Sequence, residues 1–265
     1  MSAAGPWLVV PRPSPTARLR LVCFPHSGAG ASTFAAWAGD LPPVFEVCAV
    51  QLPGREARLG EPPFTRMGPL LEAVEAGLGP RLAGRPFAFF GHSMGALVSF
   101  ELARRLQARG QGPVHLFVSG HPAPHLPDRE PPTHTLPEPE FLARLRQLNG
   151  TPPEVLDHPE LRDLIVPILR ADFAVCDTYT FTPGEPLACS LSAFGGLQDP
   201  HARRDELEAW RVHTRSTFAA RMFPGDHFYI HSARPLLLRM VARELDQWLR
   251  TGHAHDPDAP LGPAA

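Results

Sequence analysis

Short apolar runs alternate with amphipathic helical patterns through most of this 265-residue chain. The runs are almost continuously apolar, which is typical of strands covered on both faces of a parallel sheet. The expected strands are 19–24, 45–51, 86–91, 114–120, 187–195 and 218–223. Leucine and valine at helical spacing predict helices at 68–82, 95–109 and 235–250. The alternation predicts an α/β fold, a mostly parallel central sheet flanked by helices.

One long segment interrupts this alternation. From His121 to about Glu185 we expect no strand in the main order, only a proline-studded connector and two helices at 138–148 and 160–173. An ordinary helical crossover with a long loop is the alternative, but it needs far fewer residues. We therefore expect a helical lid insert at about 121–185.

The remaining boundaries follow from composition. Residues 19–250 are expected to form a single domain that carries the insert. The segments 1–18 and 251–265 are rich in proline, alanine and glycine, so we expect a loosely ordered N-terminal segment and a flexible C-terminal tail.

Composition excludes several classes of protein. Hydrophobic residues make up 43% and charged residues 20%, which excludes general disorder. A formal net charge of −2 gives no polybasic surface for nucleic acid. We find no apolar stretch of membrane-spanning length, no signal-peptide pattern and no C-x-x-C pair among the four cysteines. We expect a cytoplasmic protein with no metal, no other cofactor, and no nucleic-acid or membrane partner.

The strongest chemical signal is the sequence Gly91-His92-Ser93-Met94-Gly95, directly after one expected strand and before one expected helix. A serine at such a strand-to-helix turn is held in a strained conformation with its hydroxyl exposed. Side chains at the two flanking glycines would collide with the neighbouring strand or the helix. The pattern predicts that Ser93 is a nucleophile; the alternative is a tight turn with a bystander serine.

A serine nucleophile needs a base and an acid, and strand order indicates both. In α/β-hydrolases the acid follows a late strand and the histidine follows the last one. These positions select Asp199, after the strand 187–195, and His227, after the strand 218–223. The other candidates for the acid are Asp172, Asp177, Asp205 and Asp226. The other candidates for the base are His92, His231, His253 and His255.

The tetrahedral intermediate of acyl transfer needs two backbone donors. One is expected to be the N–H of Met94, and the other the N–H of Ser27 or, as second choice, of His26. A phosphate-binding glycine loop is the alternative for this segment, but the G-x-G-x-x-G pattern is incomplete and the chain has no lysine.

Five stretches in order then carry a family resemblance: FPHSGAG at 24–30, QLPGREAR at 51–58, FGHSMGA at 90–96, LRADF at 169–173 and GDHFYI at 225–230. Together they resemble type II thioesterases of the α/β-hydrolase superfamily, the stand-alone editing enzymes of polyketide and nonribosomal peptide synthesis. The resemblance implies Ser93 as nucleophile, Asp199 as acid, His227 as base, and a helical lid over the acyl pocket. Ser27 departs from it, because relatives usually carry a small apolar residue there.

The resemblance also implies the substrate, an acyl group on the phosphopantetheine arm of an acyl or peptidyl carrier protein. We expect a transient complex and a monomeric enzyme. Carrier domains are usually acidic, so Arg55, Arg58, Arg203 and Arg204 are candidates for a docking patch, with solvated surface or structural pairing as the alternative.

Other functions stay open at this point. The runner-up is the medium-chain thioesterase that acts with animal fatty acid synthase; a carboxylesterase, an acyltransferase and a non-catalytic binding module are further alternatives. In the insert, apolar residues that could line an acyl pocket are Phe141, Leu145, Leu148, Leu161, Ile165, Ile168 and Leu169.

Overall fold

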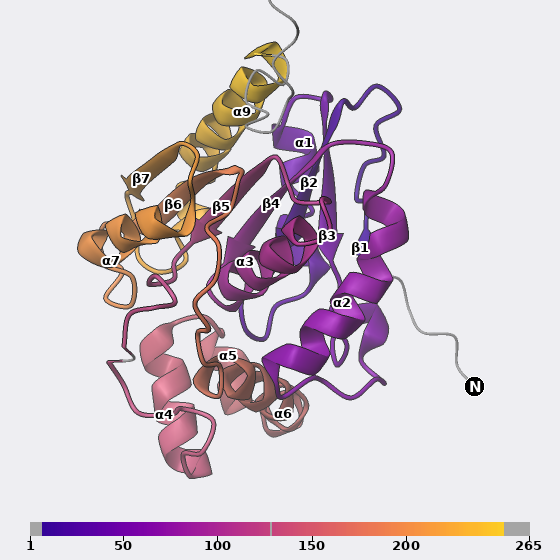
Figure 1. The fold of residues 1–265 in the computed structure, drawn as a ribbon. Coiled ribbons are helices and arrows are strands. Elements are labelled where there is room, and N and C mark those ends of the chain that lie inside the picture. Colours follow the sequence, from indigo (N-terminus) through magenta and orange to yellow (C-terminus); the bar gives the residue numbers. More distant parts are fainter. Residues whose placement is uncertain (1–6, 128, 252–265) are drawn as a thin grey trace, which may run out of the picture.

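The fold is built on a seven-stranded sheet. A computed structural model describes residues 7–127 and 129–251. The strands lie in the order β1-β3-β2-β4-β5-β6-β7 (Figure 1). Their bounds are β1 Leu8–Val9, β2 Leu19–Phe24, β3 Phe45–Val50, β4 Phe87–His92, β5 His115–Ser119, β6 Ser190–Gly196 and β7 Phe218–Phe223.

Every pairing in the sheet is parallel except that of β1 with β3. Strands β2 to β6 are buried along almost their whole length, as continuous apolar runs require. The predicted mostly parallel sheet is therefore confirmed, and its six expected strands match β2 to β7 closely.

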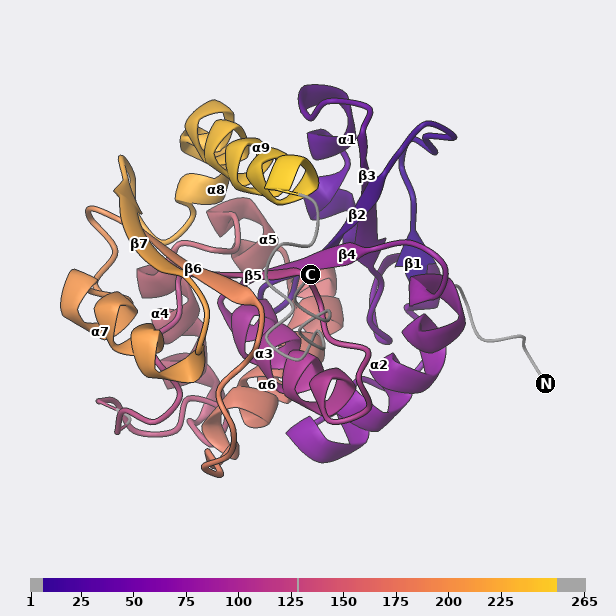
Figure 2. The ribbon, with the colours of Figure 1, turned by 45° about the horizontal axis from the view of Figure 1, so that its top comes forward.

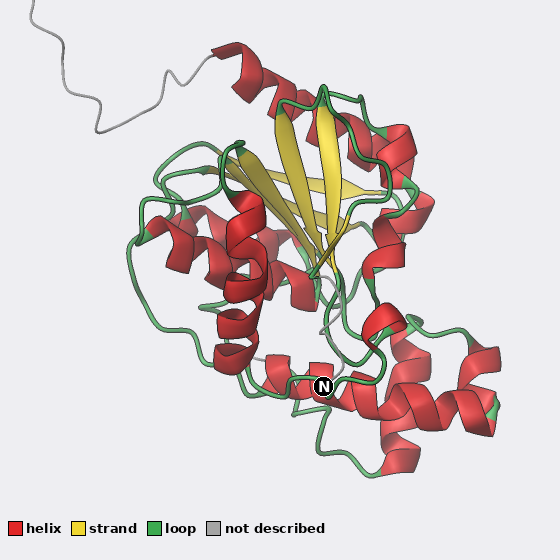
Figure 3. Cartoon of the chain, turned by 90° about the vertical axis from the view of Figure 1, so that its right-hand side faces the viewer, coloured by secondary structure: helices red, strands yellow, loops and turns green. Residues whose placement is uncertain are grey.

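Helices cover both faces of the sheet, as Figure 3 shows. In Figure 2, α2, α3 and α7 lie on one face and α1, α8 and α9 on the other. The bounds are α1 Trp37–Asp40, α2 Met67–Leu82, α3 Met94–Gln107, α7 Arg204–Glu208, α8 Tyr229–Ser232 and α9 Arg234–Thr251. Short 3₁₀ helices occupy Ala31–Phe34, Glu56–Arg58 and Ala209–His213.

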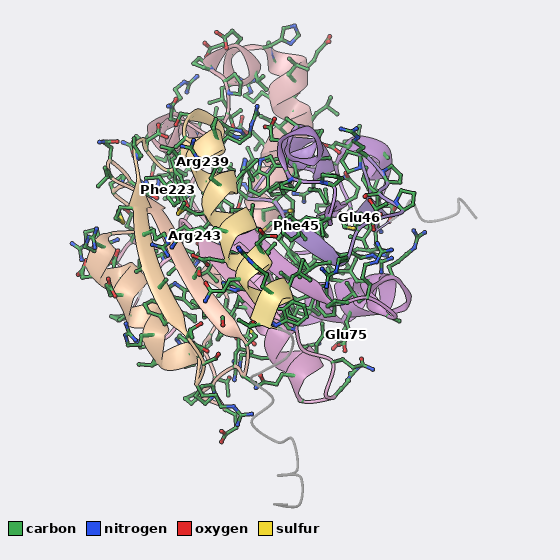
Figure 4. The ribbon with its side chains drawn as sticks, turned by 90° about the horizontal axis from the view of Figure 1, so that it is seen from above. Phe45, Glu46, Glu75, Phe223, Arg239 and Arg243 are labelled. Atoms are coloured by element: carbon green, nitrogen blue, oxygen red, sulfur yellow. The ribbon has the colours of Figure 1, made fainter. Side chains whose placement is uncertain are left out.

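Each face has its own hydrophobic core. Helix α9 illustrates the second core, because Leu237, Val241 and Leu245 are fully buried at helical spacing. Burying each of these side chains contributes about 1.5–3 kcal/mol. Arg239 and Arg243 lie on the exposed side of the helix (Figure 4). The stripe expected from the sequence is thus the one that binds α9 to the sheet.

The insert between β5 and β6 contains three helices, α4 Glu138–Leu148, α5 Pro153–Asp157 and α6 Pro159–Asp177. Two of them were expected; the short α5 was not, and α6 continues four residues beyond its expected end. Figure 1 shows the three gathered at one end of the sheet. They share a small core made by Phe141, Leu145, Leu156 and Leu169.

The N-terminal segment differs from the expectation of loose order. Leu8 and Val9 form β1, and the carbonyl of Trp7 accepts a hydrogen bond from the Gln51 N–H at 2.9 Å. The guanidinium of Arg58 lies 4.0 Å from the centre of the Trp7 ring. Apolar and aromatic residues among the prolines therefore fix this segment from Trp7 onward. Residues 1–6 and 252–265 lie outside the described residues, and so does most of the expected tail.

Within the described ranges, no helix is long and apolar enough to cross a membrane.

Candidate active site

Ser93 occupies the turn between β4 and α3. Its backbone has φ 54° and ψ −121°, an unfavourable region for a residue with a side chain. The turn is held by a 2.8 Å hydrogen bond from the Ser93 N–H to the carbonyl of Ser119. A Cβ at Gly91 would overlap the carbonyl oxygen of Gly95, and one at Gly95 would overlap that of Phe24. The expected strand–turn–helix context is present, together with the reason for both glycines.

Asp199 and His227 meet at the ends of neighbouring strands. Nδ1 of His227 lies 2.8 Å from Oδ2 of Asp199, whose side chain is completely buried. The other carboxylate oxygen accepts the N–H of His201 at 2.8 Å. With the proton of the neutral ring on Nδ1, Nε2 is left as the proton acceptor. The arrangement has the chemistry of a general base held by a buried carboxylate.

The competing carboxylates are engaged elsewhere. Asp226 accepts the N–H of Phe228 at 2.9 Å, and Asp177 pairs with His134 at 2.8 Å. Asp172 forms an ion pair with an arginine, and Asp205 is exposed. Among the competing histidines, His231 is exposed on α8, and His253 and His255 lie outside the described residues.

His92 is fully buried behind the site, as its expected packing role requires. Its ring centre lies 5.0 Å from that of His227. Burial lowers the pKa of His92 well below its ordinary value, so the ring is neutral. Nδ1 of His92 lies 2.9 Å from Oγ of Ser119, which lies 2.5 Å from the hydroxyl of Tyr229. The sequence predicts no role for Ser119 or Tyr229, although Ser119 lies near the end of the expected strand 114–120 and Tyr229 lies in the stretch 225–230.

The loop after β2 and the first residue of α3 supply the candidate oxyanion donors. Met94 is the first residue of α3, so its N–H has no helical carbonyl to bond. In the parts of the chain that the structure describes, neither the Ser27 nor the His26 N–H donates a hydrogen bond. The loop is tightened by a 3.1 Å bond from the Ala29 N–H to the His26 carbonyl. The Met94 and Ser27 N–H groups are therefore both available to an oxyanion, and the His26 N–H is the alternative to that of Ser27.

These groups open into one cavity of about 710 Å³. Ser27, Ser93, Met94 and His227 all line it, and this volume suits a medium-sized organic ligand. The insert contributes apolar and aromatic wall residues, namely Leu145, Leu148, Leu169, Phe173 and Tyr179. Of the seven insert residues expected as pocket candidates, only Leu145, Leu148 and Leu169 line the cavity. Phe141 is buried inside the insert, and Leu161 is 42% exposed.

Two of the four candidate docking arginines are buried. Arg55 is 4% exposed and pairs with Asp172, and Arg58 is 3% exposed and pairs with Glu61. A docking role for these two is therefore wrong, because both guanidinium groups bind inside the molecule, as the alternative of structural pairing expects. Arg203 and Arg204 are exposed around the start of α7.

No cluster of three or more histidine, cysteine, aspartate or glutamate side chains that could hold a metal ion occurs in the described residues.

A turn-mounted serine, a carboxylate-bound histidine and the sheet order together define an enzyme of the α/β-hydrolase class. Residues 19–247 match the model of the thioesterase domain family, and the chain belongs to that family. The chain is thus a hydrolase that acts on thioesters.

Relatives agree with this assignment. The chain is 43% identical over 246 residues to the gramicidin S biosynthesis protein GrsT of Aneurinibacillus migulanus, covering 92% of this chain and 96% of that protein. The solved structure of the type II thioesterase BorB, from the borrelidin biosynthetic cluster, superimposes with a TM-score of 0.83 at 36% identity. The alignment covers 92% of this chain and all of BorB. The human medium-chain S-acyl fatty acid synthase thioesterase is 35% identical over 222 residues, covering 82% of this chain and 83% of that protein. The resemblance to type II thioesterases is confirmed.

Proposed function

We propose that this thioesterase hydrolyses acyl groups from the phosphopantetheine arms of acyl or peptidyl carrier proteins in polyketide or nonribosomal peptide synthesis. The observation that carries the proposal is the Asp199–His227 hydrogen bond at a cavity that also exposes Ser93. The biosynthetic settings of GrsT and BorB support the substrate class. The enzyme acts as a monomer that meets its carriers transiently.

The reaction proceeds through an acyl-serine. Oγ of Ser93 attacks the thioester carbonyl while Nε2 of His227 takes the hydroxyl proton. The carbon–sulfur bond breaks, His227 passes that proton to the sulfur, and phosphopantetheine leaves as the thiol. His227 then removes a proton from water, which attacks the acyl-serine. The bond to Oγ of Ser93 breaks, Oγ takes that proton from His227, and a carboxylic acid is released. Asp199 stabilises the imidazolium in both halves.

The developing oxyanion is stabilised by the N–H groups of Met94 and Ser27. The positive end of the α3 dipole adds to this stabilisation, because the oxyanion forms at the N-terminus of that helix. The insert 121–185 covers the acyl group as a lid, a role supported by its cavity-lining residues from α4 and α6.

Mass spectrometry of a panel of acyl-loaded carrier proteins tests the proposal. The wild-type enzyme should remove the acyl mass from carrier-bound thioesters, and Ser93→Ala should be slower by about 10⁴-fold. Persistent turnover by Ser93→Ala would contradict the role of that serine. A preference for free esters would favour a carboxylesterase. Activity confined to medium-chain fatty acyl groups would favour a fatty acid synthase partner.

A further inference from the structure

Three separate segments converge beside the cavity on one buried ion pair. Arg55 follows β3, Asp172 lies in the second half of α6, and the loop 25–30 follows β2. Nη1 and Nη2 of Arg55 lie 2.6 and 2.8 Å from the two carboxylate oxygens of Asp172. The side chains are 5% and 3% exposed. All three segments carry stretches of the family resemblance, and the proposed reaction uses only the loop.

The pair also holds the backbone of the candidate oxyanion loop. Oδ2 of Asp172 accepts the N–H of Gly28 at 2.7 Å, and Nη1 of Arg55 donates to the carbonyl of Ala29 at 3.2 Å. Both contacts fall immediately after Ser27. The Gly28 N–H shares its peptide plane with the Ser27 carbonyl. The Ser27 N–H lies in the plane before, whose His26 carbonyl accepts the Ala29 N–H at 3.1 Å. Holding Gly28 and Ala29 therefore restrains the planes on both sides of Ser27, and with them the position of the Ser27 N–H.

Apolar contact between α6 and the loop reinforces this restraint. A Cβ at Gly28 would lie 2.5 Å from Cδ2 of Leu169, one turn before Asp172 on α6. Leu169 also belongs to the small core of the insert. The insert and the loop thus touch through one apolar and one charged contact on the same helix face.

The two halves of α6 differ in their attachment. From Pro159 to Pro167 no residue is buried, whereas Ile168, Leu169, Ala171, Asp172, Ala174 and Val175 are. Pro167 lacks an N–H and interrupts the helical hydrogen bonds between the halves. Asp172 lies in the buried second half of α6. Its contact with the loop therefore does not depend on the position of the exposed first half.

We propose that Arg55 and Asp172 are positioning residues that hold the Ser27 N–H in place for the oxyanion. This inference rests on the proposed function. A purely structural role is a poor explanation, because a buried ion pair is often no more stabilising than a well-packed apolar pair. The carboxylate has a second task, since it accepts the Gly28 N–H, which an apolar residue cannot do.

The positioning role and a purely structural role predict different effects on transition-state binding and on ground-state binding. Oγ of Ser93 adds to the carbonyl carbon of an acyl trifluoromethyl ketone, which places an oxyanion beside the Ser27 and Met94 N–H groups. The matching thioether has no carbonyl oxygen, so it occupies the same cavity and forms no oxyanion. Asp172→Asn should lower kcat and trifluoromethyl ketone affinity together by about 10- to 100-fold, less than the loss of a complete donor. KM and thioether affinity should stay within about twofold. Equal loss of both affinities, or no loss, would overturn the proposal.

A paired replacement guards against a simple folding defect. Arg55→Met/Asp172→Leu removes both charges and fills the space with apolar groups, so the protein should stay folded. It should nevertheless keep the low kcat and weak ketone binding, because the Gly28 N–H has lost its acceptor. Recovery of wild-type kcat would show that the pair is only structural. This variant decides the matter if Asp172→Asn does not fold.

An exposed ion pair of the same insert provides the matched control. Arg146 and Asp157 lie 2.7 Å apart with 48% and 65% of their side chains exposed, so Asp157→Asn should behave like wild type. Ser93→Ala is measured in parallel. If Ser93→Ala retains turnover, the proposed function fails; if only the Asp172 variants match wild type, the positioning role alone fails.

Discussion

Three side chains with local sequence signals come together just beyond the carboxyl ends of parallel strands. Ser93 follows β4, Asp199 follows β6 and His227 follows β7. The loops after β6 and β7 also approach closely, since a Cβ at Gly196 would overlap the carbonyl of Asp226. The buried Asp199 then holds His227, so strand order brings the residues together and one hydrogen bond orients the candidate base.

Asp199 and Asp226 provide a direct test of the acid. In Asp199→Asn the amide can donate to Nδ1 and stabilise the wrong tautomer, so kcat should fall on the order of 10³–10⁴-fold. Asp226→Asn, whose carboxylate only accepts the Phe228 N–H, should lose less than about tenfold. Steady-state hydrolysis of an acyl thioester measures both, with melting temperature as the control for folding. A larger loss of kcat in Asp226→Asn than in Asp199→Asn would mean that Asp226 is the acid of the triad.

Local signals in the sequence select the residues of the candidate triad, but not the polar contacts around them. Ser93 lies in a five-residue pattern, and Asp199 and His227 follow predicted strands. Arg55 and Asp172 are 117 residues apart, and Ser119 and Tyr229 are 110 apart. No local rule pairs such distant polar residues, so the sequence leaves docking and structural pairing both open for Arg55, which is buried.

Among the elements, length decided what the sequence could predict. Strands β2 to β7 and helices α2, α3 and α9 are long, continuous patterns and were expected nearly as they are. The two-residue β1 and the five-residue α5 are too short to show a period. Their placement depends on tertiary contacts, such as that of Trp7 with Arg58 for the N-terminal segment.

The insert should determine which acyl chains are accepted. Leu145 and Leu148 of α4 line the cavity, so replacing each with alanine should lengthen the space available to the acyl group. We expect kcat/KM for long acyl thioesters to rise relative to short ones by about three- to tenfold. Leu161→Ala, on the exposed half of α6, is the control. A uniform loss at every chain length would mean that these leucines only stabilise the insert.

At the scale of the whole molecule, the sheet separates two cores, and little apolar surface is left for self-association. The exposed large apolar side chains among the described residues lie on five separate segments: Leu59, Leu161 and Leu164 together, Leu197, Val212 and Leu236. Scattered residues of this kind are normal on a monomer. Light scattering should therefore give a mass near 28.9 kDa at micromolar concentration. A stable dimer mass would contradict the monomer proposal.

Two histidines with lowered pKa values should make the whole molecule sensitive to acid. Burial lowers the pKa of His26 to about 4. The pKa of His213 is also lowered to about 4, mainly by burial and next by the neighbouring His125. In the unfolded chain both rings titrate near 6.5. Between these pH values the two rings bind protons in the unfolded chain but not in the folded chain. Their contribution to the free energy of unfolding is therefore complete above about pH 6.5 and is lost progressively toward pH 4.

His213→Gln tests this linkage at a distance from Ser93. The variant removes one of the depressed histidines, so its free energy of unfolding should fall less steeply with acidification than that of wild type. The absolute stability at pH 7 should be lower, because the ring packs against Phe100 and Trp210. Urea denaturation at pH 7, 6 and 5 gives the slope, and His158→Gln, at an exposed position, should reproduce the wild-type slope. An unchanged slope in His213→Gln would mean that this histidine is not among the groups that destabilise the fold in acid.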